Sequence, residues 1–294
     1  MAEKSATADD PIPGNAETIA AAARAGEPDR YLAALLSPAP ARPALLALAA
    51  FSAEIGRVPF VAANEPAIGE IRLQWWREAL DPARPPALTG SPIADALQAA
   101  AERYGLSRGR LEDMIDARSL DVCGEVPADD AALRDYLWKS EGVPFALAAR
   151  VVAPAVPAEE TDPAAAECGH AYGLARLLLG LPRALSQGHM PLPRSRLGLA
   201  GVGQEDLLAG NAGVGVAGLL AGLRSECRAA LVTSRRHVAN LPREIRAAFL
   251  PLALVEPYLR ALERPGRDLL RGAVEIVPLV RVYRIAMAHW RGRV

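Results

Sequence analysis

The stretch GHAYGLARLLLGLPRALSQGHMPLPRSRL, Gly169 to Leu197, joins an apolar helical pattern to a loop that contains several prolines. Four arginines fall within it, while no aspartate or glutamate occurs from Cys168 to Gln204. A buried charge is costly unless it is paired, so these arginines need acids from other segments or a bound anion. The stretch therefore predicts a buried helix whose arginines meet partners that the local sequence does not supply.

The rest of the chain repeats this helical pattern. Apolar residues make up 51% of the sequence and aromatic residues only 5%, and the abundance of alanine and leucine favours helices over strands. In residues 41–58, Leu45, Leu48, Phe51 and Ile55 recur on one helical face. Further helices are predicted over residues 129–152 and 242–263, and a break at Gly26–Pro28 precedes Asp29, a candidate N-cap. In the helix predicted over residues 66–80, Glu70, Gln74 and Arg77 share one face. The sequence predicts one all-α domain over residues 18–294, preceded by a disordered, polar tail over residues 1–17.

Composition excludes several classes of function. A net charge of −1 gives no general attraction to nucleic acid, so no nucleic-acid partner is expected. Three scattered cysteines fit neither a disulfide framework nor a zinc site, and they suit a reducing cytoplasm. The sequence has no uninterrupted run of about 18 apolar residues, so no membrane-spanning helix is predicted. We expect a cytoplasmic protein; peripheral contact with the inner membrane stays open, with residues 211–223 as the most lipid-tolerant segment.

Motifs for common chemistries are lacking in the sequence. It has no nucleophile elbow, no Walker lysine loop and no paired histidine spacing for a metal. Asp113 and Asp116 share a helix face and could hold a divalent ion, although a solvated face is the interpretation we favour. Of the adjacent Trp75 and Trp76, at least one is expected to enter the core.

Several stretches, in order along the chain, resemble the squalene/phytoene synthase family. They are DRYLAALLSPAPARPALLALAAF (29–51), IGEIRLQWWREAL (68–80), DMIDARSLDV (113–122), LRDYLWKSEGVPFAL (133–147), GHAYGLARLLLGLPRALSQGHMPLP (169–193) and LPREIRAAFLPLALVEPYLRALE (241–263). The resemblance implies an all-α, isoprenoid-synthase-like helical bundle around a central cavity. It also implies head-to-head condensation of two prenyl diphosphates, with two aspartate motifs holding Mg²⁺ that neutralises the leaving diphosphate.

The sequence departs from the family pattern at both motifs. Aligned through Phe51, the first motif's acids fall on Gly56, Arg57 and Phe60, with only Glu54 acidic nearby; those of the second fall on Gly180 and Ala184, next to Arg183. The family's glutamine and asparagine in that helix are replaced by Gly173 and Arg176. Through FSAEIGRV (51–58) and GEIRLQWWREAL (69–80), the chain is more similar to the family's subgroup of mitochondrial complex I assembly factors.

The first hypothesis is therefore a non-catalytic protein that binds an isoprenoid or assists the assembly of respiratory complex I, with complex I subunits or assembly proteins as partners and no cofactor. Arg57, Arg176 and Arg183 would bind a diphosphate or a carboxylate directly, or would instead pair with Glu54, Glu70 or Glu141. The candidate residues for the cavity or an anionic ligand are Glu54, Arg57, Glu70, Gln74, Tyr136, Tyr172, Arg176 and Arg183.

Two alternatives remain. The first is an active prenyl transferase that condenses farnesyl or geranylgeranyl diphosphate with a rearranged Mg²⁺ site made from Glu54, Asp116 and Asp121. The second is a structural interaction protein with a collapsed cavity, which an exposed apolar patch around Trp75, Trp76 or Trp138 would favour.

Overall fold

The computed structural model describes residues 13–81, 89–211, 213–264 and 268–294, and within these ranges every regular element is a helix. The first half of the chain contributes α1 (Pro13–Gly26), α2 (Pro28–Leu36), the short 3₁₀ helix η1 (Ala39–Ala41), α3 (Arg42–Val61), α4 (Pro66–Ala79), α5 (Pro92–Tyr104) and α6 (Arg108–Val122). The second half contributes α7 (Asp130–Leu137), the π-helical turn η2 (Trp138–Gly142), α8 (Val143–Val152), α9 (Ala158–Ser186), α10 (Arg194–Leu199), α11 (Gln204–Leu208), α12 (Val214–Asn240), the 3₁₀ helix η3 (Arg243–Leu254), α13 (Val255–Leu262) and α14 (Pro278–Arg291). The predicted all-α class is confirmed.

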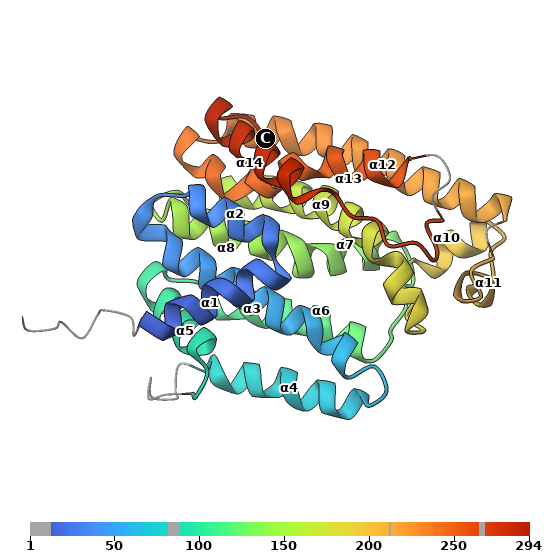
Figure 1. Cartoon of the computed structure of the whole chain (residues 1–294), viewed down its shortest axis with the longest axis horizontal. Coiled ribbons are helices and arrows are strands. Elements are labelled where there is room, and N and C mark those ends of the chain that lie inside the picture. The colour runs from blue at the N-terminus through green and yellow to red at the C-terminus, as the bar shows by residue number, and fades with distance from the viewer. Residues whose placement is uncertain (1–12, 82–88, 212, 265–267) are drawn as a thin grey trace, which may run out of the picture.

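The helices form two packed groups that meet along α8 and η2. In one, α3 packs against α1, α5 and α6. In the other, α9 packs against α12, α8 and η2, so the helix of the opening stretch lies at the centre of the second core. Figure 1 shows these two groups one above the other, with α2 and α8 between them.

Local sequence explains where several helices begin. The side chains of Ser91, Ser107 and Asp129 each accept a hydrogen bond from a backbone N–H in the first turn of α5, α6 and α7, which satisfies a donor that the helix itself cannot. The four residues expected on one face of residues 41–58 are all buried in α3. That prediction is confirmed.

Helix α3 also bears on the question of a membrane span. No membrane-spanning helix is predicted from the sequence. Residues Ala39–Val61 nevertheless contain a window with a mean hydropathy of 1.6 and are long enough to cross a bilayer. However, 61% of the most apolar window is buried inside the protein. Its apolar character therefore matches its place in the core.

The structure corrects three boundaries. Helix α1 begins at Pro13, inside the predicted tail, whose residues 1–12 lie outside the described residues. The helix expected over residues 129–152 contains the π-helical turn η2 just before Pro144, a residue that cannot donate a backbone hydrogen bond. Residues 243–254 are 3₁₀ rather than α-helical, with Pro251 inside the segment.

Candidate functional site

An open cavity of about 380 Å³ lies between the two groups of helices and is walled by α3, the end of α6, η2 and α9. All the positions that align with the family's two acidic motifs line it. They are Gly56, Arg57 and Phe60 from α3, and Gly180, Arg183 and Ala184 from α9. Arg176 and Gly173 also line it, about one and two turns before Gly180 in α9. The cavity thus brings together the positions that the sequence resemblance assigns to the two acidic motifs.

Arg176 of α9 is paired with acids from segments far away in the sequence. Arg176 bonds Glu27 at 2.7 Å and approaches Glu141 at 3.5 Å. Arg30 bonds the same two carboxylates, at 2.7 Å to Glu27 and 2.6 Å to Glu141. Two arginines and two glutamates therefore form a closed, electrically neutral network of four side chains, which we call the ion network.

The ion network is almost completely removed from water on three of its members. The side chains of Glu27, Glu141 and Arg30 are 4%, 8% and 10% exposed, while Arg176 is 32% exposed towards the cavity. Burial alone would raise the pKa of Glu27, but Arg176 and Arg30 outweigh it and lower this pKa to about 2. Burial alone would lower the pKa of Arg30, but Glu27 and Glu141 raise it above its ordinary value. Glu27, Arg30 and Arg176 are therefore charged at neutral pH.

A second buried cluster lies directly behind this network. Asp29 accepts hydrogen bonds from Tyr172 at 2.7 Å and from Tyr258, and its other oxygen lies 2.7 Å from Arg281 of α14. Arg30 and Arg176 both lie over the ring of Tyr172. Asp29, expected to cap the helix that follows the Gly26–Pro28 break, is instead a buried acid that ties α2 to α9, α13 and α14.

The opposite wall carries Asp121 and two partners. Arg118 and the hydroxyl of Tyr136 both donate to the same oxygen of Asp121, at 2.9 Å and 3.1 Å. These bonds tie the end of α6 to α7. Arg183 forms no ion pair with the described residues; its guanidinium lies 3.9 Å from the centre of the Phe60 ring.

The residues present do not fit a Mg²⁺ cage. Mg²⁺ favours octahedral coordination by oxygen and is held through carboxylates, yet no three His, Cys, Asp or Glu side chains gather in the described part of the chain. The three acids proposed for a rearranged site each bond a different arginine: Glu54 with Arg57, Asp116 with Arg77, and Asp121 with Arg118. The rearranged site is therefore not assembled.

Four of the predicted cavity residues line the cavity, and four do not. Arg57, Tyr136, Arg176 and Arg183 are on its wall. Glu54 lies on another face and pairs with the exposed Arg57. The predicted cavity location of Glu70 and Gln74 is wrong, because both lie on the outer helix α4. There Glu70 contacts Arg77 and Ser119, and Gln74 bonds Glu78. The predicted cavity location of Tyr172 is also wrong, because this residue is buried in the core, where it donates a hydrogen bond to Asp29.

Sequence reasoning missed Glu27, Arg30 and Arg118. The signal for the first two was present, because EPDR, residues 27–30, places three charges at the start of an otherwise apolar helix. The expected alternative, a buried ion pair, holds for Arg176 with Glu141; Arg57 does pair with Glu54, but at the surface. Glu70 instead meets Arg77.

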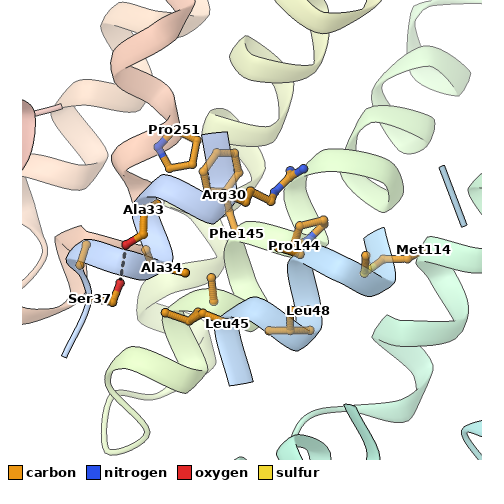
Figure 2. Close-up of a pocket in the computed structure, with 14 residues that line it drawn as sticks. Arg30, Ala33, Ala34, Ser37, Leu45, Leu48, Met114, Pro144, Phe145 and Pro251 are labelled. Atoms are coloured by element: carbon orange, nitrogen blue, oxygen red, sulfur yellow. Dashed lines mark hydrogen bonds between the residues drawn. The ribbon is translucent and has the colours of Figure 1, made fainter. Parts of the chain in front are cut away.

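Behind Arg30 lies an apolar pocket of only about 30 Å³, lined by side chains such as Leu45, Met114 and Phe145. Figure 2 shows Arg30 at this pocket among small and apolar side chains. Pockets for small organic ligands typically measure roughly 300–1,000 Å³. The apolar interior behind Arg30 is thus nearly filled, while the open cavity outside it is lined by both charged and apolar residues.

Trp75, Trp76 and Trp138 do not form the exposed apolar patch that would favour a structural interaction protein. Trp76 is buried against Phe51, with ring centroids 5.0 Å apart, and Trp75 lies half-buried against Trp76. Trp138 is also half-buried, beneath Arg110. The expectation that one of the adjacent tryptophans enters the core is confirmed.

The ion network predicts a specific loss of stability in acid. The pKa of Glu27 is about 2 in the folded protein and 4.5 as its ordinary value, so the unfolded chain binds its proton first as the pH falls. The stabilisation is complete above pH 4.5 and is lost as the pH falls towards 2. Urea unfolding across this range should show Glu27→Gln with a shallower fall in unfolding free energy than wild type.

A matched carboxylate separates this effect from general acid unfolding. Hydrogen bonding to His170, together with Arg196, lowers the pKa of Glu226 to about 2. Glu226→Gln should remove a separate part of the same slope, because Glu226 lies outside the ion network. A Glu27→Gln slope identical to wild type would show that Arg30 and Arg176 do not hold the pKa of Glu27 down.

Comparison with known proteins shows which family this chain belongs to and which proteins resemble it. The squalene/phytoene synthase family model matches residues 23–281. The protein "NADH dehydrogenase (ubiquinone) complex I, assembly factor 6" of Mus musculus is 26% identical over 282 residues, which cover 96% of this chain and 84% of the mouse protein. Its Homo sapiens counterpart is 24% identical over 261 residues, covering 89% and 78%.

Solved structures show the same fold. Squalene synthase HpnC from Alicyclobacillus acidocaldarius matches with a TM-score of 0.67 at 20% identity, over 86% of this chain and 94% of that protein. A dehydrosqualene synthase in complex with ligand matches with a TM-score of 0.75 at 14% identity, over 96% and 99%. At these identities the likeness establishes the architecture and leaves the chemistry open.

Proposed function

We propose that this chain, which belongs to the squalene/phytoene synthase family, acts as a non-catalytic assembly factor for respiratory complex I. The mouse and human relatives that carry the assembly-factor name align over most of their length and of this chain. At 24–26% identity, the name that these two relatives carry supports a role for this chain in the same process, the assembly of complex I. The argument against catalysis comes from the site itself.

The ion network is the observation that carries the proposal. A condensing enzyme of this family needs carboxylates that are free to hold metal ions around a leaving diphosphate. In this chain the buried carboxylates at the cavity, Glu27 and Glu141, are each bonded to arginine, and Asp121 is bonded to Arg118. The remaining acid on the wall, Glu125, is exposed. Three of the four acids on the cavity wall, Glu27, Glu141 and Asp121, are thus already paired with arginine.

The same contacts weigh against tight binding of a prenyl diphosphate. Arg30 and Arg176 would have to release buried carboxylates before they could bind an anion, and that release leaves charges unpaired. The apolar pocket of about 30 Å³ behind Arg30 has no room for a prenyl chain, so such a chain would have to lie in the open cavity of about 380 Å³ beside the ion network. We therefore place the protein's function at its surfaces rather than in its cavity.

Incubation of the purified protein with farnesyl or geranylgeranyl diphosphate, with and without Mg²⁺ or Mn²⁺, tests the absence of catalysis. Mass spectrometry should detect no condensed product in any arm. The melting temperature should also stay unchanged, because Arg176 is already paired with carboxylates and Arg183 is packed against the Phe60 ring. A metal-dependent condensed product would overturn the proposal in favour of a prenyl transferase.

Deletion of the chain in its native cell tests the positive claim. Native gels should show less assembled complex I, and NADH:ubiquinone oxidoreductase activity should fall with it. Complementation by the double variant Glu54→Gln, Asp121→Asn should restore assembly, because a non-catalytic protein does not need these acids as metal ligands. Normal complex I in the deletion strain, or rescue that depends on both acids, would contradict the proposal.

A further inference from the structure

Helix α14 turns an apolar face to the solvent. Leu279, Tyr283 and Trp290 are 74%, 57% and 75% exposed. Their spacing of four and seven residues places all three on one side of the helix. Val282 is also exposed, at 47%. Helix α14 packs against η3 and α2 at the periphery of the bundle (Figure 1).

This arrangement inverts the usual pattern of a surface helix. Such a helix normally buries its apolar stripe and shows charged residues to water. In α14 only the small Ala288 and Ile285 are buried, and Arg281 points inward to pair with Asp29. The arginine on the opposite side of the helix is therefore bound to the core, and the aromatic and aliphatic side chains remain outside.

A basic groove lies at the C-terminal end of the same helix, on the side of Ala288 and Gly292 rather than on the apolar face. Among the described residues that line it are Arg42, Arg243, Arg246 and Arg293, with Glu244 as the one acid. Arg246 donates to the backbone carbonyls of Ala239 and Leu241, and Arg42 to that of Ser37, so these bonds leave their charges uncompensated. The sequence from Ile276 to Val294 contains four arginines and no acid.

We propose that this face of α14 docks onto the surface of an anionic lipid bilayer. An apolar stripe with a tyrosine and a tryptophan suits the boundary between headgroups and acyl chains, where aromatic side chains are enriched. The exposed Arg291 and Arg293, at the end of the same helix, suit anionic headgroups, which attract juxtamembrane basic residues. The helix has 14 residues, so it lies along the surface and does not cross the bilayer. This inference does not rest on the assembly function.

The location differs from the one expected from sequence. Residues 211–223 expose Val214 at 93%, but its exposed neighbours in α12 are glycine and alanine. No arginine or lysine falls within that segment. Helix α14 offers both large apolar side chains and positive charge, the two components that peripheral binding requires.

Flotation of the full-length protein with vesicles tests the proposal. Vesicles of phosphatidylcholine alone are compared with vesicles that also contain phosphatidylglycerol. We expect the protein to float with the anionic vesicles, to bind the neutral ones far less, and to bind the anionic ones less tightly as salt is raised. The triple variant Leu279→Gln, Tyr283→Gln, Trp290→Gln should lose about tenfold or more in vesicle affinity.

A matched variant separates this face from general stickiness. Ile71, Leu199 and Val214 are 68%, 90% and 93% exposed on other elements, and their replacement by glutamine should leave vesicle binding unchanged. Melting curves check that both triple variants fold. The proposal fails if wild type does not float or if the α14 variant floats as well as wild type. It also fails if sedimentation shows a dimer that only the α14 variant dissolves, because a second copy would then cover this face.

Discussion

Replacement of Arg30 by methionine is expected to lower the free energy of unfolding by about 3–5 kcal/mol, the usual cost of removing one partner from a buried ion pair. Arg30 bonds both Glu27 and Glu141, and all three side chains are at most 10% exposed. Without it, two buried carboxylates would share the single charge of Arg176. Equilibrium unfolding in urea, without any ligand, measures the loss.

Two further variants make this result specific. Arg57→Met breaks the Arg57–Glu54 pair, whose arginine is 64% exposed, and should cost less than about 1 kcal/mol because exposed pairs contribute little. The double variant Arg30→Met, Glu141→Gln should be more stable than Arg30→Met alone, since one unpaired carboxylate is removed. If Arg30→Met stays within about 1 kcal/mol of wild type, the ion network is not the structural element inferred here.

The fold was largely predictable from the sequence because helical periodicity is a local property. The face of Leu45, Leu48, Phe51 and Ile55 lies within one helix, and its burial followed from spacing alone. The break at residues 26–28 was equally visible, since glycine and proline interrupt helices for local steric reasons. The changes of helix type at η2 and η3 were not, because they depend on packing around prolines.

The site was less predictable because its contacts join distant segments. The arginines of the opening stretch indicated that partners were needed, but Glu27 is 149 residues from Arg176 in the sequence. Arg30 and Glu141 are 111 residues apart. Glu70 and Gln74 shared the expected helix face, yet that face turned outward, and periodicity alone cannot decide which neighbour a polar face meets.

Gly169 is the position where the smallest substitution should have the next largest effect. A Cβ atom there would lie 2.3 Å from the Cα of Gly142 and 2.5 Å from its backbone nitrogen. Because the obstacle is backbone, it cannot be relieved by a change of rotamer, and α9 and η2 must move apart. Gly169→Ala should therefore destabilise the protein by about 3 kcal/mol, at the upper end of the cost of overpacking. The same movement would draw Glu141 away from Arg30.

Gly180 provides the control on the same helix. A Cβ atom there meets nothing within 4 Å, so Gly180→Ala should be neutral or should stabilise α9 by about 0.5–1 kcal/mol through its lower backbone entropy. Both variants change one glycine of α9 to alanine, and only the neighbouring atoms differ. Urea unfolding of the pair thus measures the close approach of α9 and η2 directly. If the two variants have equal stability, that approach does not fix the position of Glu141.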